Sequence, residues 1–285
     1  MFSHISTRWR LAGMSLPAVA VLLPFLLAVV LVARFSFSAD TQAIEGWTGQ
    51  HYAELSQPFF METLARTFKL AAYSTVICVV LAVPLALLLA AVTSPAWRRL
   101  VMCLVLLPMI LNLLIQSYGW MMVLGAHGIV NRTLMALGLA QQPVQMLFNE
   151  FGVLMGMVQT ALPLAVFPIL AAMRGVQSEL IEAASSLGAT PWRSFVDVTL
   201  PLLRPGLVGA ASIVFAFNAS AFAVPLLLGG RRVRTVGTAI RDMVGTLFDW
   251  AGAAAAGVVL IVITFAALYL AQAAVQLWQR KAGAA

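Results

Sequence analysis

Residues 70–97, LAAYSTVICVVLAVPLALLLAAVTSPAW, contain no Asp, Glu, Lys or Arg. A helix of about 20 apolar residues crosses the hydrocarbon core of a bilayer, so this stretch is long enough to span it. Five further stretches also lack these charged residues, and they run from Leu11 to Ala33, Leu100 to Asn131, Phe151 to Met173, Pro205 to Gly230 and Trp250 to Gln279. The sequence therefore predicts an all-α integral membrane protein with six transmembrane helices.

The composition of the chain supports this class. Of the 285 residues, 62% are hydrophobic and only 9% are charged, whereas soluble domains carry about 25% charged residues. A soluble binding module is thereby excluded. The net charge of +7 comes from small basic groups between the apolar runs, which suits lipid headgroups and partner proteins better than nucleic acid.

The third stretch is too long for one helix. Gly125, His127 and Gly128 predict that its helix stops near Leu124 and that a loop follows. Prolines recur within several spans, which favours a helix bundle because neighbouring helices can satisfy the backbone groups that proline leaves unpaired.

The first stretch resembles a signal peptide in its flanking charges but not in its length. Arg8 and Arg10 precede it, yet it exceeds the apolar region of about 7 to 15 residues of a signal peptide, and we expect a retained anchor helix. The distribution of Lys and Arg between alternate loops gives only a slight preference for a cytoplasmic N-terminus.

No metal site or cofactor is expected. The two cysteines, Cys78 and Cys103, lie within apolar stretches and are expected to pack as small hydrophobic residues. The three histidines are far apart in the sequence and have no second ligand nearby. These patterns predict no metal and no cofactor.

The polar loop from Arg174 to Arg204 predicts two short helices. Ser178 is a suitable N-cap for the first helix, and Gly188 fits the left-handed turn that ends it. Thr190 followed by Pro191 is typical of the start of the second. The second helix is expected to end at the prolines that follow, Pro201 and Pro205. On these signals alone, a capped connector that has no partner is the favoured interpretation.

A spaced motif in this loop changes that interpretation. Glu182-Ala183-Ala184 is followed by Gly188 and then by Val198-Thr199-Leu200-Pro201. The pattern resembles the EAA loop of binding-protein-dependent ABC importer permeases of the MetI-like family, which reads E-A-A, then G four positions after the second A, then I-x-L-P. Only Val198, in place of isoleucine, departs from it.

Other segments resemble the spermidine/putrescine-type permeases of this family, and the likeness covers roughly residues 60 to 275. They include Leu107-Pro108, Gln116-Ser117-Tyr118-Gly119-Trp120, Gly128-Ile129-Val130-Asn131 and Pro225-Leu226-Leu227-Leu228-Gly229-Gly230. The family usually has an arginine before the Tyr-x-Trp group, where this chain has Gln116-Ser117. That departure weakens the inference about the substrate.

The resemblance implies a type I ABC importer permease with a cytoplasmic coupling helix between transmembrane helices four and five. The coupling loop, 174–206, would dock on a cytoplasmic ATPase dimer through Glu182, Ala183, Ala184, Gly188, Leu200 and Pro201. A second permease, more often a paralogue than a copy, and a periplasmic solute-binding protein would complete the complex in the bacterial inner membrane.

The resemblance also implies how the chain is divided. Residues 1–62 would be an anchor helix and a periplasmic loop, residues 63–279 the permease core with five transmembrane helices, and residues 280–285 a cytoplasmic tail. Both termini would be cytoplasmic.

The chain is expected to be a transport subunit and not an enzyme. A P-loop needs G-x-x-x-x-G-K-[ST], so that backbone amides and the lysine hold the phosphates. The two lysines, Lys69 and Lys281, follow Phe68 and Arg280, and neither fits. ATP hydrolysis must therefore occur on a separate chain.

Polar side chains within the spans are candidates for the translocation pathway, because polar groups are costly in a membrane. They are Asn112, Gln116, Tyr118, Gln159 and Asn218, with Thr160 as a further candidate. Interhelical hydrogen bonds that hold the bundle together are the alternative role for all of them.

The substrate is open at this stage. The resemblance favours a polyamine, and Glu150, Asp242 and Asp249 would attract a cation at the outer helix ends. The basic cluster Arg231, Arg232 and Arg234 instead suits an anionic or zwitterionic solute, an acidic binding protein, or a solvated loop. Related permeases that import an opine, a phosphonate, thiamine or iron remain alternatives.

Two other classes of membrane protein fit less well. A secondary transporter usually carries charged residues within its spans and often an inverted repeat, and neither is visible in the sequence. A membrane enzyme or redox subunit would need paired histidines, an intramembrane acid–base group or a set of metal ligands.

Overall fold

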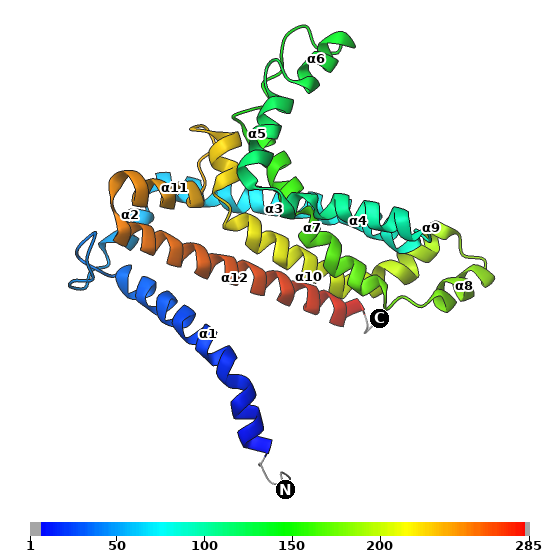
Figure 1. The fold of residues 1–285 in the computed structure, drawn as a ribbon, viewed down its shortest axis with the longest axis horizontal. Coiled ribbons are helices and arrows are strands. Elements are labelled where there is room, and N and C mark those ends of the chain that lie inside the picture. Colours follow the sequence, from blue (N-terminus) through cyan, green and yellow to red (C-terminus); the bar gives the residue numbers. More distant parts are fainter. Residues whose placement is uncertain (1–6, 283–285) are drawn as a thin grey trace. The chain divides into compact units, whose positions relative to one another are not determined.

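The structure is a computed structural model that describes residues 7–282, with side chains described from residue 19 to residue 277 except at 178. The described residues form helices and loops without a strand (Figure 1). The α-helices are α1 (Thr7–Phe35), α2 (Gln50–Leu55), α3 (Pro58–Ala91), α4 (Pro95–Ile110), α5 (Leu113–Leu124), α6 (Ile129–Ala136), α7 (Glu150–Met173), α8 (Ser178–Ser186), α9 (Pro191–Ser194), α10 (Leu200–Ala219), α11 (Val236–Asp242) and α12 (Trp250–Ala282). Three π-helical segments accompany them, namely η1 (Phe195–Thr199), η2 (Pro225–Gly229) and η3 (Met243–Leu247).

Several of these helices are suited to a membrane. Within the described residues, five stretches are long and apolar enough to cross a bilayer, and they are Pro58–Ala91, Leu113–Ala136, Glu150–Met173, Pro191–Ala219 and Trp250–Leu277. The first predicted span lies in α1, whose side chains are described only from Val19 onward. The all-helical fold is confirmed, and the count of six transmembrane helices stays a prediction.

The chain divides into two compact units. The first combines the described part of residues 1–57 with residues 240–261, and the second combines residues 58–239 with the described part of residues 262–285. In the first unit, polar contacts order the loop after α1: the Ser36 hydroxyl lies 2.7 Å from the Tyr52 hydroxyl, and the Arg34 guanidinium lies 3.8 Å from the centre of the Trp47 ring.

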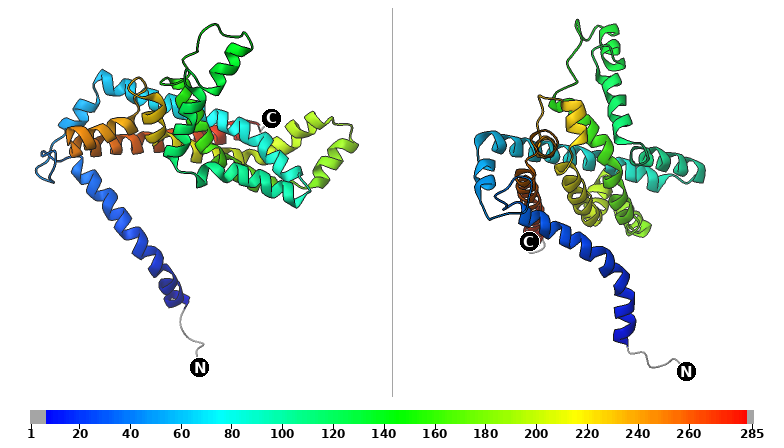
Figure 2. Two further views of the ribbon diagram at one scale, coloured as in Figure 1. Left: turned by 45° about the horizontal axis from the view of Figure 1, so that its top comes forward. Right: turned by 60° about the vertical axis from the view of Figure 1, so that its left-hand side comes forward.

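The second unit is built around α3, α7 and α10, which pack on one another (Figure 2). Small residues contribute to the contact surfaces, since Ala82, Ala86, Ala161, Ala165 and Ala210 are all fully buried. Since lipid tails are as apolar as a core side chain, association of helices in a membrane depends on such close packing. Cys78 is fully buried in this core as expected, whereas Cys103 is exposed.

The boundaries of the second and third spans differ from the prediction. Helix α3 begins at Pro58, upstream of the uncharged stretch, because Glu62 and Arg66 form an ion pair one helical turn apart and do not interrupt the helix. It ends at Ala91, and Ser94 is extended, as expected of a residue before proline.

The third span is broken in its middle. Helix α4 ends at Ile110, Leu111 is extended, and α5 begins after Asn112, whose side chain accepts a hydrogen bond from the amide of Leu114 at 2.8 Å. Asparagine side chains compete in this way with helical hydrogen bonds. Helix α5 ends at Leu124, as predicted.

The predicted end of the second loop helix at Pro201 and Pro205 is wrong. Segments α9, η1 and α10 form one continuous helical stretch, with Pro201 in the first turn of α10 and Pro205 inside it. Pro201 is tolerated because the first residues of a helix need no amide donor, and Pro205 is accommodated within α10, as prolines are in transmembrane helices that pack on neighbours. Helix α10 ends at Ala219, and the predicted continuation to Gly230 is instead the separate segment η2.

Candidate functional site

The loop between α7 and α10 contains two capped helical segments, as predicted. Gly188 has a φ of +85°, the left-handed conformation that favours glycine. Its amide donates to the carbonyl of Ser185 and the amide of Ala189 donates to the carbonyl of Ala184, each at 3.0 Å. This is the hydrogen-bond pattern of a Schellman motif, which ends α8 and turns the chain sharply.

The second segment begins at the predicted cap. The Thr190 hydroxyl accepts a hydrogen bond from the amide of Arg193 at 3.3 Å, and Pro191 is the first helical residue. Helix α8 itself begins at Ser178, so Gln177 and not Ser178 is in the N-cap position. Helix α8 contacts both α9 and η1, which brings the two halves of the spaced motif into one folded unit.

This unit exposes apolar side chains. Leu187 is 89% exposed and Trp192 is 73% exposed, and both lie beside the turn at Gly188. Glu182 is exposed and has no ion pair among the described residues. Sequence reasoning assigned no role to Leu187 or Trp192, although apolar residues in a polar loop were a visible signal.

Of the polar residues within the spans, Gln116 lies at the break between α4 and α5. Its side-chain amide donates to the carbonyls of Pro108 at 2.6 Å and of Leu111 at 2.8 Å, which the break leaves without helical partners. The side chain is 7% exposed, and its Oε1 has no hydrogen-bond partner among the described residues. Gln116 therefore offers a buried acceptor at a discontinuous helix.

Asn218 on α10 offers a second buried acceptor. Its Nδ2 donates to the Ser74 hydroxyl on α3 at 2.8 Å, whereas its Oδ1 is buried and lacks a partner in the described structure. The contact with Ser74 is the interhelical bond that the structural alternative predicted. The side-chain oxygen of Asn218, Oδ1, remains an acceptor for a ligand.

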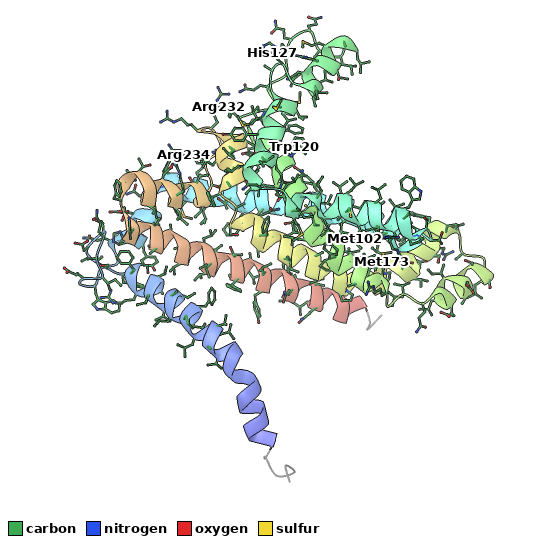
Figure 3. All side chains as sticks on the ribbon, viewed as in Figure 1. Met102, Trp120, His127, Met173, Arg232 and Arg234 are labelled. Carbon is green, nitrogen blue, oxygen red and sulfur yellow. The ribbon has the colours of Figure 1, made fainter. Side chains whose placement is uncertain are left out.

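Of the remaining candidates for the pathway, some form hydrogen bonds within or between helices and one is exposed. Trp120 on α5, labelled in Figure 3, donates from its indole nitrogen to Oε1 of Gln159 on α7. This hydrogen bond joins the two helices. The Thr160 hydroxyl bonds only to carbonyls of its own helix. Tyr118 is 58% exposed.

A charged network lies at the start of α7, the opposite end of this helix from the coupling loop. The Lys69 ammonium is 2.7 Å from the Glu150 carboxylate, and Arg66 is 3.6 Å from the same carboxylate. Arg66 also donates to the carbonyl of Arg232 at 3.3 Å. The negative charge of Glu150 is thus already balanced within the chain.

The other two carboxylates expected to attract a cation are engaged as well. Asp242 pairs with Arg241 at 2.8 Å, and the Asp249 carboxylate accepts the amide of Gly252 at 2.8 Å. By contrast, Arg231, Arg232 and Arg234 are exposed.

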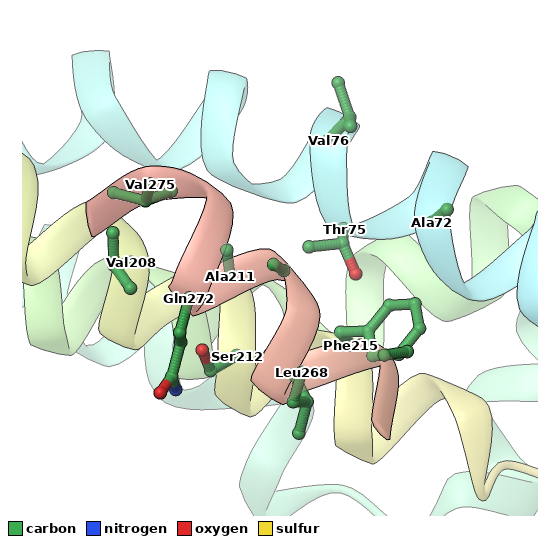
Figure 4. A pocket seen from close by; sticks show the side chains of 12 residues that line it. Ala72, Thr75, Val76, Val208, Ala211, Ser212, Phe215, Leu268, Gln272 and Val275 are labelled. Carbon is green, nitrogen blue, oxygen red and sulfur yellow. The ribbon is translucent and has the colours of Figure 1, made fainter. Parts of the chain in front are cut away.

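A cavity of about 360 Å³ lies between α3, α10 and the part of α12 that belongs to the second unit (Figure 4). Its lining is almost wholly apolar, with Thr75, Ser212 and Gln272 as its polar side chains. The Thr75 hydroxyl already donates to the carbonyl of Ala71 at 2.6 Å. The cavity therefore provides few groups that would hold a polar solute.

The sequence matches known proteins over most of its length. The family model described as binding-protein-dependent transport system inner membrane component matches residues 82–280. The spermidine/putrescine transport system permease protein PotB of Haemophilus influenzae is 30% identical over 234 residues, or 82% of each chain. The molybdenum transport system permease protein ModB of Azotobacter vinelandii is 33% identical over 181 residues, 62% of this chain and 78% of ModB. A putative 2-aminoethylphosphonate permease protein, PhnU of Salmonella choleraesuis, is 29% identical over 230 residues, 77% of this chain and 79% of PhnU.

Solved structures share the fold. A bacterial ABC transporter that imports the acidic polysaccharide alginate superposes with a TM-score of 0.78 at 22% identity, covering 94% of this chain and 95% of that chain. The same transporter has been solved in complex with an alginate-bound periplasmic protein. The MetNI methionine ABC transporter, in an inward-facing conformation, gives a TM-score of 0.58 at 19% identity and covers 77% of this chain and 97% of that chain.

Proposed function

Since the chain belongs to the family of binding-protein-dependent transport system inner membrane components and is a permease subunit of an ABC importer, we propose that it imports a polyamine through a pathway it shares with a second permease. A paralogous permease, a cytoplasmic ATPase dimer and a periplasmic binding protein complete the complex. The alginate transporter solved in complex with a periplasmic protein supports the last of these partners. The protein is a multi-pass inner-membrane protein, and in this proposal both termini are cytoplasmic.

The coupling loop is proposed as the contact with the ATPase. The observation that carries this assignment is the folded unit of α8, α9 and η1, which joins both halves of the motif and exposes Leu187 and Trp192 on either side of its turn at Gly188. Glu182 adds a carboxylate that can form a charge-assisted hydrogen bond to a basic partner group. Leu200 and Pro201 continue the same unit into α10 and would transmit its movement to the pathway.

The chain contains a matched control for this assignment. Leu137 and Gly138 follow α6 as Leu187 and Gly188 follow α8: Gly138 has a φ of +69°, the amide of Leu139 donates to the carbonyl of Leu134 at 2.9 Å, and Leu137 is 67% exposed. Neither glycine has another atom within 4 Å of an added Cβ. Alanine at either site therefore meets the same backbone strain, about 1 to 2 kcal/mol.

The experiment compares retention of the ATPase by the tagged full-length chain. We expect Gly188→Ala, Leu187→Ser and Glu182→Ala to lower the amount of co-purified ATPase, and Gly138→Ala and Leu137→Ser to retain it at the wild-type level. Equal losses in both sets would count against the coupling loop. Normal amounts of each variant in the membrane establish that the comparison is between folded proteins.

The polyamine assignment depends on two observations. PotB of Haemophilus influenzae is similar over 82% of both chains, and the two orphaned buried atoms among the pathway candidates, Gln116 Oε1 and Asn218 Oδ1, are both acceptors. An ammonium group is a pure donor, so it complements such oxygens. Asn112, Tyr118 and Gln159 would complete the polar lining.

A second candidate is an anionic or phosphonate solute. The similarity to ModB and PhnU and the exposed arginines Arg231, Arg232 and Arg234 favour it. The two candidates are separated by reconstituting the complex in liposomes with its binding protein and measuring ATP hydrolysis. We expect stimulation by spermidine or putrescine and none by molybdate or 2-aminoethylphosphonate. Stimulation by molybdate or 2-aminoethylphosphonate, and none by spermidine or putrescine, would mean that the transported solute is an anion or a phosphonate.

A further inference from the structure

A second cavity lies at the other end of the bundle from the charged network, where α3, α4 and α7 meet. Its volume is about 380 Å³, within the range of roughly 300 to 1,000 Å³ that small-molecule sites occupy. Its lining combines apolar side chains with two arginines, and these are Leu89, Ala90, Met102, Leu170, Met173, Val176, Arg98 and Arg174. Met102 and Met173 are labelled where α4 approaches the end of α7 in Figure 3.

One of the arginines is fixed against the cavity by the protein itself. Arg98 Nε donates to the carbonyl of Leu89 at 3.2 Å, so the guanidinium is tied to the end of α3. Its two terminal nitrogens have no hydrogen-bond partner among the described residues. They are therefore available to an acceptor in the cavity.

The second arginine stands at the C-terminal end of a helix. Arg174 follows the last residue of α7, where the helix dipole favours a cation. No carboxylate of the described part of the chain pairs with either Arg98 or Arg174, whereas Arg66, Arg193 and Arg241 each have one. Two cations thus face the cavity beside its apolar side chains, and no carboxylate of the described residues balances their charge.

We propose that this cavity binds one anionic phospholipid. The phosphate would lie between Arg98 and Arg174, because a guanidinium matches phosphate geometry with two parallel hydrogen bonds. An acyl chain would lie against Met102, Leu170 and Met173. Basic pockets between transmembrane helices on the cytoplasmic side have this recognition chemistry.

The assignment to the inner leaflet rests on the proposed function, since the cavity is at the end of α7 that continues into the coupling loop. Binding itself does not depend on that orientation. A lipid held at this place would touch α4 and α7 directly before the coupling loop begins at residue 174.

The test measures phosphatidylglycerol binding to the purified full-length chain, together with the subunits that accompany it, by native mass spectrometry. The variants are Arg98→Gln with Arg174→Gln, which removes the charges, and Ala90→Phe, which fills the cavity from α3 and keeps both arginines. The control is Arg99→Gln, the exposed neighbour whose Nε bonds only to Pro95 of its own helix and which does not line the cavity.

We expect the double arginine variant to bind phosphatidylglycerol about 25-fold more weakly, since each arginine near an anionic lipid contributes roughly a factor of five. Ala90→Phe should also weaken binding, Arg99→Gln should not, and zwitterionic phosphatidylcholine should bind equally poorly to all forms. Unchanged thermal unfolding midpoints of the variants would show that weaker lipid binding comes from loss of the site and not from loss of the fold.

Three results would overturn the proposal. They are equal losses in Arg98→Gln and Arg99→Gln, full binding by Ala90→Phe, and displacement of the lipid by millimolar inorganic phosphate, which would make the cavity a phosphate site. The experiment needs neither solute nor a docked ATPase, so its failure would leave the proposed transport function unaffected.

Discussion

At the scale of single residues, Asn218 and Ser74 join two helices that are 144 positions apart in the sequence. We expect a double-mutant cycle of Ser74→Ala and Asn218→Ala to give a coupling free energy of about 0.6 to 1.7 kcal/mol, the range for hydrogen bonds between transmembrane helices. The measurement is the free energy of unfolding in detergent micelles. Thr75→Ala is the control, because the Thr75 hydroxyl bonds within its own helix and its cycle with Asn218→Ala should show no coupling. Additive effects of Ser74 and Asn218 would contradict the prediction.

At the scale of elements, the packing of α10 on α7 depends on one glycine. A Cβ on Gly206 would lie 2.6 Å from the Cβ of Ala172 and 2.8 Å from the carbonyl oxygen of Pro168, whereas a Cβ on Gly209 would meet only the Cβ of Pro168, at 4.0 Å. We expect Gly206→Ala to lower the free energy of unfolding by about 1 to 3 kcal/mol through overpacking. Gly209→Ala should leave it unchanged or raise it by up to about 1 kcal/mol, since alanine is the better helix former. Thermal unfolding of both variants decides the matter, and equal midpoints would mean that α10 does not pack as closely as described.

At the scale of the whole molecule, the proposed orientation predicts which loops face the periplasm. In a chain without Cys78 and Cys103, we expect Ile44→Cys and Leu139→Cys to react with a membrane-impermeant maleimide on intact spheroplasts. Leu187→Cys should react only after the membrane is opened. All three positions are exposed, so accessibility within the chain does not limit the reaction.

The labelling pattern also tests the number of spans. Between positions 139 and 187, α7 is the one helix long and apolar enough to cross a membrane, so labelling of both from one side would show that α7 does not cross it. Inverted labelling of all three positions would reverse the proposed orientation.

Local rules predicted the turns of the coupling loop correctly. The left-handed Gly188 and the Thr190 cap depend on residues within a few positions of one another, so they are readable without the rest of the fold. The same rules failed at Pro201 and Pro205, because Pro201 falls in the first turn of α10 and Pro205 is tolerated inside that packed helix. They also missed the break at Leu111, because Asn112 was interpreted as a pathway residue and not as the cap of a new helix.

The polarity of the candidate pathway residues identified them in the sequence, but it did not predict their roles. The hydrogen bonds of Gln159 with Trp120 and of Asn218 with Ser74 join different helices, so only the tertiary structure identifies these partners. Glu150 was expected to attract a cation, but Lys69 and Arg66 already balance its charge.

The sequence by itself determined that this protein is a helical membrane protein with a capped, motif-bearing loop. The physical reason is that the cost of placing charged residues in lipid and the preferences of single turns act over short stretches of chain. Only the tertiary structure decided which polar groups pair across helices, which buried oxygens are left without partners, and that Arg98 and Arg174 line one cavity. Those relations depend on how distant helices pack, and this close packing is not encoded in any one stretch.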